Sequence, residues 1–225
     1  TPTDYFNDNP RLLCNSQDAK AWALYFDGTW DVTDAFSISA GYRYSDEKKD
    51  WAGRPMAFYL GGEPVGDLDE WLDGADWDQY PEGVVYNSHS WNEPSYRLVL
   101  GYDFSDRQYG YFSFNHSFKS GGYNDQLGTT LNPITDFAAE PTKPEIADSF
   151  EIGYKASSED GTASAAIDAY YVQYKDAQKT FNVSFPDGQQ ETLFFNAADL
   201  DVWGIEGEGA WAVSDAFLLR WNGSY

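Results

Sequence analysis

The chain has 225 residues and a formal net charge of −23, with 37 acidic residues against 14 basic ones. This balance excludes a nucleic-acid-binding protein, because a phosphate backbone is bound by clusters of Lys and Arg. Aromatic residues make up 18% of the chain, which excludes a disordered protein, and no apolar run approaches the roughly 18 residues of a membrane helix. A soluble β-protein and a membrane β-barrel both remain, since alternating strands escape a hydropathy search.

The chain repeats one unit, in which two alternating runs of about ten residues flank a short polar turn. Asp, Ser, Thr and Gly fill these turns, and they are the usual turn-forming residues. A longer connection leads from each unit to the next. The predicted strand pairs are 20–30 with 36–45, 96–104 with 109–118, 149–157 with 162–174, and 200–211 with 217–225. The fold class predicted is therefore all-β, an antiparallel meander of about eight strands.

One face of these strands is apolar and the other is polar. In the first strand, Trp22, Leu24 and Phe26 share a face that alternates with Ala23 and Asp27. A soluble β-sandwich also alternates. The predicted strand length matches the 9–11 residues of a tilted transmembrane strand, and the aromatic residues gather near the strand ends as in a membrane girdle. Both features favour an antiparallel transmembrane β-barrel.

The polar face predicts a wet lumen, because outer-membrane barrels alternate apolar residues outward with polar ones inward. The charged side chain of Asp27 belongs to this face. The residues predicted to line the lumen are Arg43, Arg97, Asp103, Glu151, Lys155, Asp168, Glu206, Glu208 and Arg220.

The long connections, residues 46–95, 120–148 and 175–199, are predicted to be irregular loops facing the medium. Outer-membrane barrels place short turns in the periplasm and long loops outside, where recognition often occurs. Large aromatic side chains in these loops are the candidates for substrate binding. They are Trp51, Trp71, Trp77, Tyr80, Trp91 and Tyr123.

An acidic loop is the one candidate metal site. Its carboxylates could hold Ca²⁺, but their spacing differs from that of an EF-hand, and a solvated loop is the favoured interpretation. The candidate ligands are Asp67, Asp69, Asp73 and Asp76. The two histidines, His89 and His116, form no ligand pair in sequence, and Cys14 has no partner for an intrachain disulfide. No catalytic constellation appears, so we predict neither an enzyme nor a resident cofactor.

Several stretches, taken together and in order, resemble the β-barrel of TonB-dependent receptors. The most specific is KPEIADSFEIGYK at 143–155, which is similar to the Pro-Glu…Ser-x-Glu-x-Gly-x-Lys strand entry of that family. Each of the other stretches is weak alone. They are GYRYSDEKK at 41–49, FKSGGYN at 118–124, GTASAAIDAYYVQYKDAQ at 161–178 and NAADLDVWGIEGEGAWAVSD at 196–215.

The resemblance implies a barrel of roughly 22 strands around a plugged lumen. Eight strands, no plug, no TonB-binding box and an end within a strand at Tyr225 lead us to expect that residues 1–225 are a partial barrel. The many charges on the polar face would be desolvated inside a narrow closed barrel. We therefore expect an open, curved sheet whose first and last strands do not pair.

The function that the resemblance implies is TonB-dependent import of a scarce nutrient, of the siderophore-iron, cobalamin or glycan type, across a bacterial outer membrane. The implied partners are outer-membrane lipid, the nutrient, and the TonB–ExbB–ExbD system acting through a plug domain. Two alternatives stay open: a passive porin or small structural barrel, and a secreted β-domain that binds carbohydrate through its Trp-rich loops.

Overall fold

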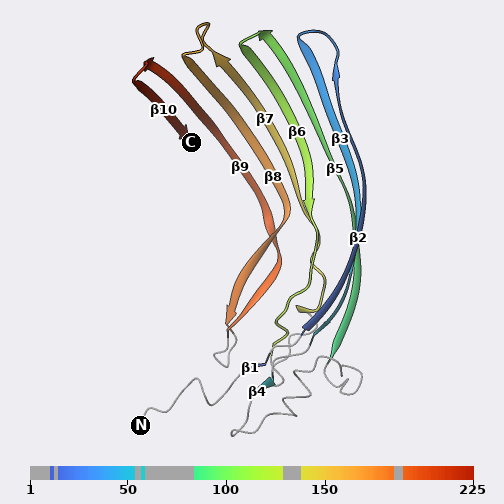
Figure 1. Cartoon of the computed structure of the whole chain (residues 1–225). Coiled ribbons are helices and arrows are strands. Elements are labelled where there is room, and N and C mark those ends of the chain that lie inside the picture. Colours follow the sequence, from blue (N-terminus) through green and yellow to red (C-terminus); the bar gives the residue numbers. More distant parts are fainter. Residues whose placement is uncertain (1–10, 13–14, 54–56, 59–83, 129–137, 185–189) are drawn as a thin grey trace, which may run out of the picture.

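Eight antiparallel strands form a single sheet in the computed structural model, which describes residues 11–12, 15–53, 57–58, 84–128, 138–184 and 190–225. The spatial order is β10-β9-β8-β7-β6-β5-β3-β2, a simple meander (Figure 1). The strands are β2 (Asn15–Asp31), β3 (Phe36–Gly53), β5 (Val85–Ser105), β6 (Gln108–Lys119), β7 (Glu145–Ser157), β8 (Ala163–Ser184), β9 (Gln190–Ser214) and β10 (Phe217–Ser224). Two short strands, β1 (Arg11–Leu12) and β4 (Ala57–Phe58), pair separately.

The four predicted hairpins are confirmed, and their short turns lie at one end of the sheet, opposite the long connections (Figure 1). Side-chain oxygens satisfy the backbone in these turns. Thr33 Oγ1 accepts a hydrogen bond of 2.9 Å from the Phe36 N–H, and Asp160 accepts one of 3.0 Å from the Thr162 N–H. Gly161 has φ of 70°, a conformation that glycine adopts without a steric penalty.

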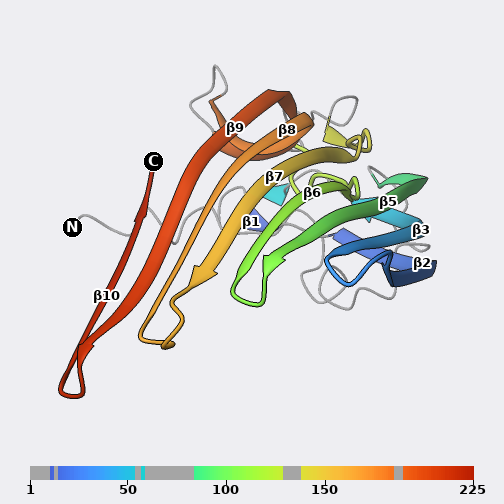
Figure 2. The same ribbon diagram turned by 90° about the horizontal axis from the view of Figure 1, so that it is seen from above.

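The sheet is open and curved (Figure 2). Strands β2 and β10 form its two edges, and in the part of the chain that the structure describes they do not pair with each other. This confirms the expectation of an open sheet with separate first and last strands.

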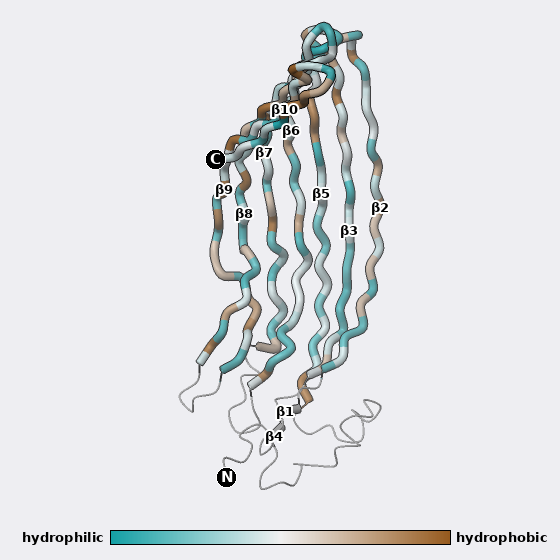
Figure 3. Tube along the Cα trace, turned by 60° about the vertical axis from the view of Figure 1, so that its left-hand side comes forward, coloured by the Kyte–Doolittle hydropathy of each residue, from teal (hydrophilic) through white to brown (hydrophobic). Residues whose placement is uncertain are grey.

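The two faces of the sheet differ as predicted, with hydrophobic and hydrophilic residues interspersed along each strand (Figure 3). The register aligns apolar residues of neighbouring strands, so that one side, here called the apolar face, is continuous. One such row runs through Ile38, Leu100, Phe112, Ile152, Ala169 and Ile205. Large side chains on this face are open to the surroundings: Leu24 is 73% exposed, Ile152 63% and Trp203 60%. Among the described residues, no helix is long and apolar enough to span a membrane.

The strands are longer than predicted, so they extend into all three predicted loops, and most of the loop 175–199 is strand. β8 has 22 residues and β9 has 25. Residues 46–53, 85–95, 145–148, 175–184 and 190–199 continue the hydrogen-bonded ladders into the expected loops. At 46–50 and 87–90 the prediction failed because polar residues occupy both faces, so the apolar alternation that identifies a half-buried strand is lost. At 175–199 the register shifts between β8 and β9 interrupt the alternation.

A small hydrophobic core sits at the end with the long connections. Its buried residues are Trp51, Leu127, Ala138, Ala139 and Leu193. They come from the extensions of β3 and β9 and from the segment between β6 and β7, so this core joins parts of the chain that the sheet alone would leave apart.

Candidate functional site

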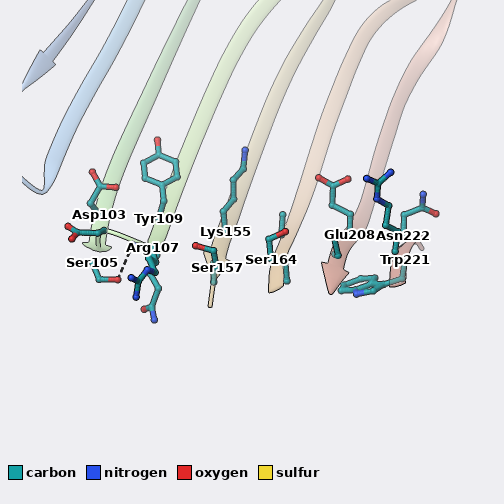
Figure 4. Close-up of a pocket in the computed structure, with 18 residues that line it drawn as sticks. Asp103, Ser105, Arg107, Tyr109, Lys155, Ser157, Ser164, Glu208, Trp221 and Asn222 are labelled. Carbon is teal, nitrogen blue, oxygen red and sulfur yellow. Dashed lines mark hydrogen bonds between the residues drawn. The ribbon is translucent and has the colours of Figure 1, made fainter. Parts of the chain in front are cut away.

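The polar face is a wall of charged and hydroxyl side chains contributed by every strand from β2 to β10. The register places on this one face all nine charged residues predicted for it: Arg43, Arg97, Asp103, Glu151, Lys155, Asp168, Glu206, Glu208 and Arg220. Near the short turns the face is hollowed, with a volume of about 710 Å³. Asp103, Tyr109, Lys155 and Glu208 line this hollow from neighbouring strands (Figure 4).

Charges on the polar face are unevenly distributed between its two sides. On the β2–β5 side, Arg97 forms an ion pair of 2.7 Å with Asp27. On the β7–β9 side carboxylates dominate, and Asp168 lies directly opposite Glu206 in the register. Glu151 accepts a hydrogen bond from the Tyr111 hydroxyl. The β7–β9 side is therefore suited to a partner that carries positive charge.

Three of the predicted aromatic residues come together at the far end of the polar face. Trp51 and Tyr123 stack with ring centroids 5.3 Å apart, and Trp91 meets Tyr123 edge-on at 6.0 Å. Trp51 and Trp91 lie in β3 and β5 rather than in loops, and they are only 5% and 3% exposed. Their predicted placement in loops was therefore wrong, because both indoles are buried in strands. The imidazole of His89 is exposed and packs against Trp91 at 4.8 Å.

The segment after β6 crosses this aromatic cluster. Residues 120–128 and 138–143, here called the strap, lie against side chains of β3 and β5 that belong to the polar face. The Trp91 indole N–H donates to the Thr142 carbonyl at 2.9 Å, and Asn87 donates to the Ala139 carbonyl at 2.8 Å. On the other side Asn124 accepts from the Phe194 N–H at 2.6 Å. The strap thus joins the β3–β5 hairpin to the β8–β9 hairpin.

A β-bulge lets β9 contribute to both parts of the site. The register of β8 and β9 shifts twice: between Tyr174 and Ala177, where Asp176 of β8 has φ of 51°, and between Ala177 and Gln178, where β9 has the extra residue. On one side of the shift the even-numbered Glu206 faces the polar side, and beyond it the odd-numbered Leu193 enters the core. A bulge inserts one residue and re-aims the side chains that follow. The sequence did not predict this bulge, because residues 175–178 show no alternation of apolar and polar side chains.

Two ionisable groups at this end have shifted pKa values. Burial, followed by the nearby carboxylates of Asp50 and Glu140, raises the pKa of the Tyr123 hydroxyl. Hydrogen bonds from Lys48 and then Ser88 lower the pKa of Asp50. Tyr123 therefore stays a neutral phenol at neutral pH, which is compatible with its position in the aromatic cluster.

Other predicted site residues cannot be placed. The aromatic candidates Trp71, Trp77 and Tyr80, the acidic candidates Asp67, Asp69, Asp73 and Asp76, and Cys14 all lie outside the described residues. Within the described ranges no three Asp, Glu, His or Cys residues are grouped so that they could hold a metal ion. The amides that fasten the strap, Asn87, Asn124, Gln178 and Asn196, were missed, because single polar residues in expected loops give no sequence signal.

A curved antiparallel meander with one exposed apolar face and one polar face is the architecture of a membrane β-barrel wall. The family described as TonB dependent receptor-like, beta-barrel, matches residues 1–225, and the chain belongs to this family. Its curated relatives include the pesticin receptors of Yersinia enterocolitica and Yersinia pestis, at 28% and 27% identity over 92% of the chain. The chain spans about a quarter of their length, 26%.

Solved structures show the same fold. The ferric yersiniabactin uptake receptor FyuA from Yersinia pestis superposes with a TM-score of 0.65 at 22% identity, covering 93% of this chain and 27% of that one. The siderophore receptor PiuA from Acinetobacter baumannii superposes with a TM-score of 0.60 at 13% identity, covering 94% and 26%. The resemblance to TonB-dependent receptors is therefore confirmed.

Proposed function

We propose that this chain is part of the wall of an outer-membrane importer that takes up a scarce nutrient with energy supplied through TonB. The observation that carries the proposal is the pairing of an exposed apolar face with a charged polar face on one curved sheet. The apolar face would contact lipid, and the polar face would line the lumen, where its nine charged residues meet water and a plug domain. TonB–ExbB–ExbD would act through that plug.

A ferric siderophore is the nutrient class we propose. The support is by analogy, since relatives are named as receptors for ferric yersiniabactin and for other siderophores. The aromatic residues Trp71, Trp77 and Tyr80 are proposed ligand contacts. Trp51 and Trp91 are buried, so we propose that they and Tyr123 stabilise the end of the sheet where the ligand binds rather than contact the ligand. We propose that the exposed His89 ring contacts the ligand.

Uptake of radioactive iron by iron-starved cells tests this function. The full-length protein would be the sole siderophore receptor in the strain, and ferric yersiniabactin, a ferric catecholate and a ferric hydroxamate would be offered separately. We expect uptake of at least one complex that disappears when TonB is deleted. Uptake that continues at the same rate without TonB would favour the passive porin instead.

A further inference from the structure

The strap is attached to the wall in a different way from the strands. Each strand of the sheet is held by a backbone ladder along its length, whereas the strap residues are outside these ladders and only Gly128 among them forms a single bridge. Individual side chains attach it instead: Lys49 donates to the Gly121 carbonyl at 2.6 Å, alongside the bonds from Trp91 and Asn87. Segments with few backbone ladders open at lower free energy than the sheet that supports them.

One side chain holds both ends of the strap. The carboxamide nitrogen of Gln178 donates to the Ser120 carbonyl at 3.1 Å, where the strap begins, and to the Lys143 carbonyl at 2.9 Å, where it ends. The backbone N–H of Gln178 donates to Glu145 at 2.6 Å. Gln178 is 6% exposed, so water does not compete freely for these bonds. Asn196 adds a second fastening, since it accepts from the Lys143 N–H at 2.8 Å.

We propose that Gln178 is a latch that stabilises the closed position of the strap over the polar face at the mouth, and that the strap opens more often when this latch is lost. Gln178 bonds to the entry and to the exit of the strap, which the Thr142 N–H and the Gly122 carbonyl also join to each other at 2.8 Å. Removing its two donors therefore weakens the attachment of the strap to the wall at both ends. Opening would separate Tyr123 from Trp51 and Trp91 and uncover the polar face behind them. The proposal stands on the geometry of this chain and does not depend on which nutrient is transported.

Thiol labelling of the full-length protein in intact cells tests the latch. Ala138 lies in the core at 0% exposure, and Glu140, two residues along the strap, is exposed. In a Cys14→Ser background, Ala138→Cys would report opening to a membrane-impermeant maleimide, and Glu140→Cys would report full access. We expect Cys at 138 to be protected while Gln178 is present.

Gln178→Glu replaces the donating NH₂ with an acceptor of nearly the same shape. We expect it to raise the labelling rate at position 138 by about tenfold or more, because the loss of two buried hydrogen bonds shifts the opening equilibrium by at least that factor. Gln178→Ala should do the same without adding a charge. Gln173→Glu is the matched control, since Gln173 lies on the same strand but bonds to Tyr171 on the apolar face; it should leave position 138 protected.

The possible outcomes can be told apart when folding is checked by the shift in gel mobility on heating. Protection of position 138 in folded Gln178→Glu and Gln178→Ala proteins would overturn the latch. So would equal labelling at 138 and 140 with Gln178 present, or an equal effect of Gln173→Glu. None of these labelling rates depends on a ligand, so a failure of the proposed transport would neither support nor contradict the latch.

Discussion

Arg97 and Asp27 form a two-pronged ion pair across an intervening strand. Arg97 Nε and Nη2 donate to the two carboxylate oxygens of Asp27 at 2.8 and 2.7 Å. Asp27 is in β2 and Arg97 is in β5, and Gly41 of β3 lies between them in the register. A Cβ at position 41 would stand 2.3 Å from Asp27 Oδ2 and 3.3 Å from Arg97 Cγ. The pair can form over β3 because residue 41 has no side chain.

Gly41→Ala should therefore break this ion pair while the sheet stays intact, because the clashing atoms are ends of flexible side chains. Asp27→Asn should remove the same interaction from the other partner. In a double-mutant cycle on the full-length protein, measured by urea unfolding in detergent, we expect the two changes to be non-additive. Gly28→Ala is the control, since a Cβ there meets nothing within 4 Å. Purely additive effects would show that Gly41 does not act through the pair.

The sequence was informative where one face of a strand is apolar and the other is polar. The alternation around Leu100 and Phe150 predicted both the strands and their faces. It did not predict the extension of β3, which is polar on both faces up to Asp50, or that of β9, where a register shift interrupts the alternation. It also did not predict the attachments of the strap, because they depend on contacts between residues far apart in sequence. Trp51 and Trp91 were predicted to be substrate-binding residues in loops. Their placement in loops was wrong, because both are buried in strands and burial depends on tertiary packing.

The face assignment predicts opposite results for two neighbouring substitutions. Leu100 lies on the apolar face near mid-strand, and Val99 points to the polar face. Leu100→Arg should lower the free energy of unfolding by about 2–4 kcal/mol in a bilayer, as for Arg at the midplane of a barrel wall. Val99→Arg should change it little, because the polar face would be in contact with water in the proposed lumen. Equal effects in urea titrations of the reconstituted full-length protein would refute the assignment.

We expect the hydrogen bond from the Trp91 indole N–H to stabilise the protein in addition to the packing of the Trp91 ring. Trp91→Phe leaves the buried Thr142 carbonyl without this donor, which typically lowers stability by about 1–3 kcal/mol. Hydrogen exchange should then rise in strap residues 138–143. Trp51→Phe is the control, because it removes similar ring area from the same aromatic cluster around Tyr123 but not the bond to Thr142. If Trp51→Phe loosens this part of the strap as much as Trp91→Phe, packing rather than the hydrogen bond holds it.

The turn between β7 and β8 should weaken in acid through Asp160. One oxygen of this carboxylate accepts hydrogen bonds from the Ser158 hydroxyl at 2.6 Å, and from the Thr162 N–H and hydroxyl at 3.0 and 2.7 Å. These bonds lower its pKa from 3.8 to about 2. A lowered pKa in the folded state stabilises the protein at pH values above 3.8, and this stabilisation is lost as the pH falls from 3.8 through about 2.

Asp160→Asn removes the charge but keeps an acceptor oxygen, so we expect it to destabilise the full-length protein at about pH 6 and to have little effect near pH 2. The measurement is the difference in urea midpoint between the unsubstituted and substituted proteins at each pH. Glu159→Gln is the control, because it changes the neighbouring carboxylate in the same turn but none of the three hydrogen bonds to Asp160. It should destabilise the protein less than Asp160→Asn at neutral pH. A constant difference for Asp160→Asn across the same range would show that the hydrogen bonds do not favour the charged form.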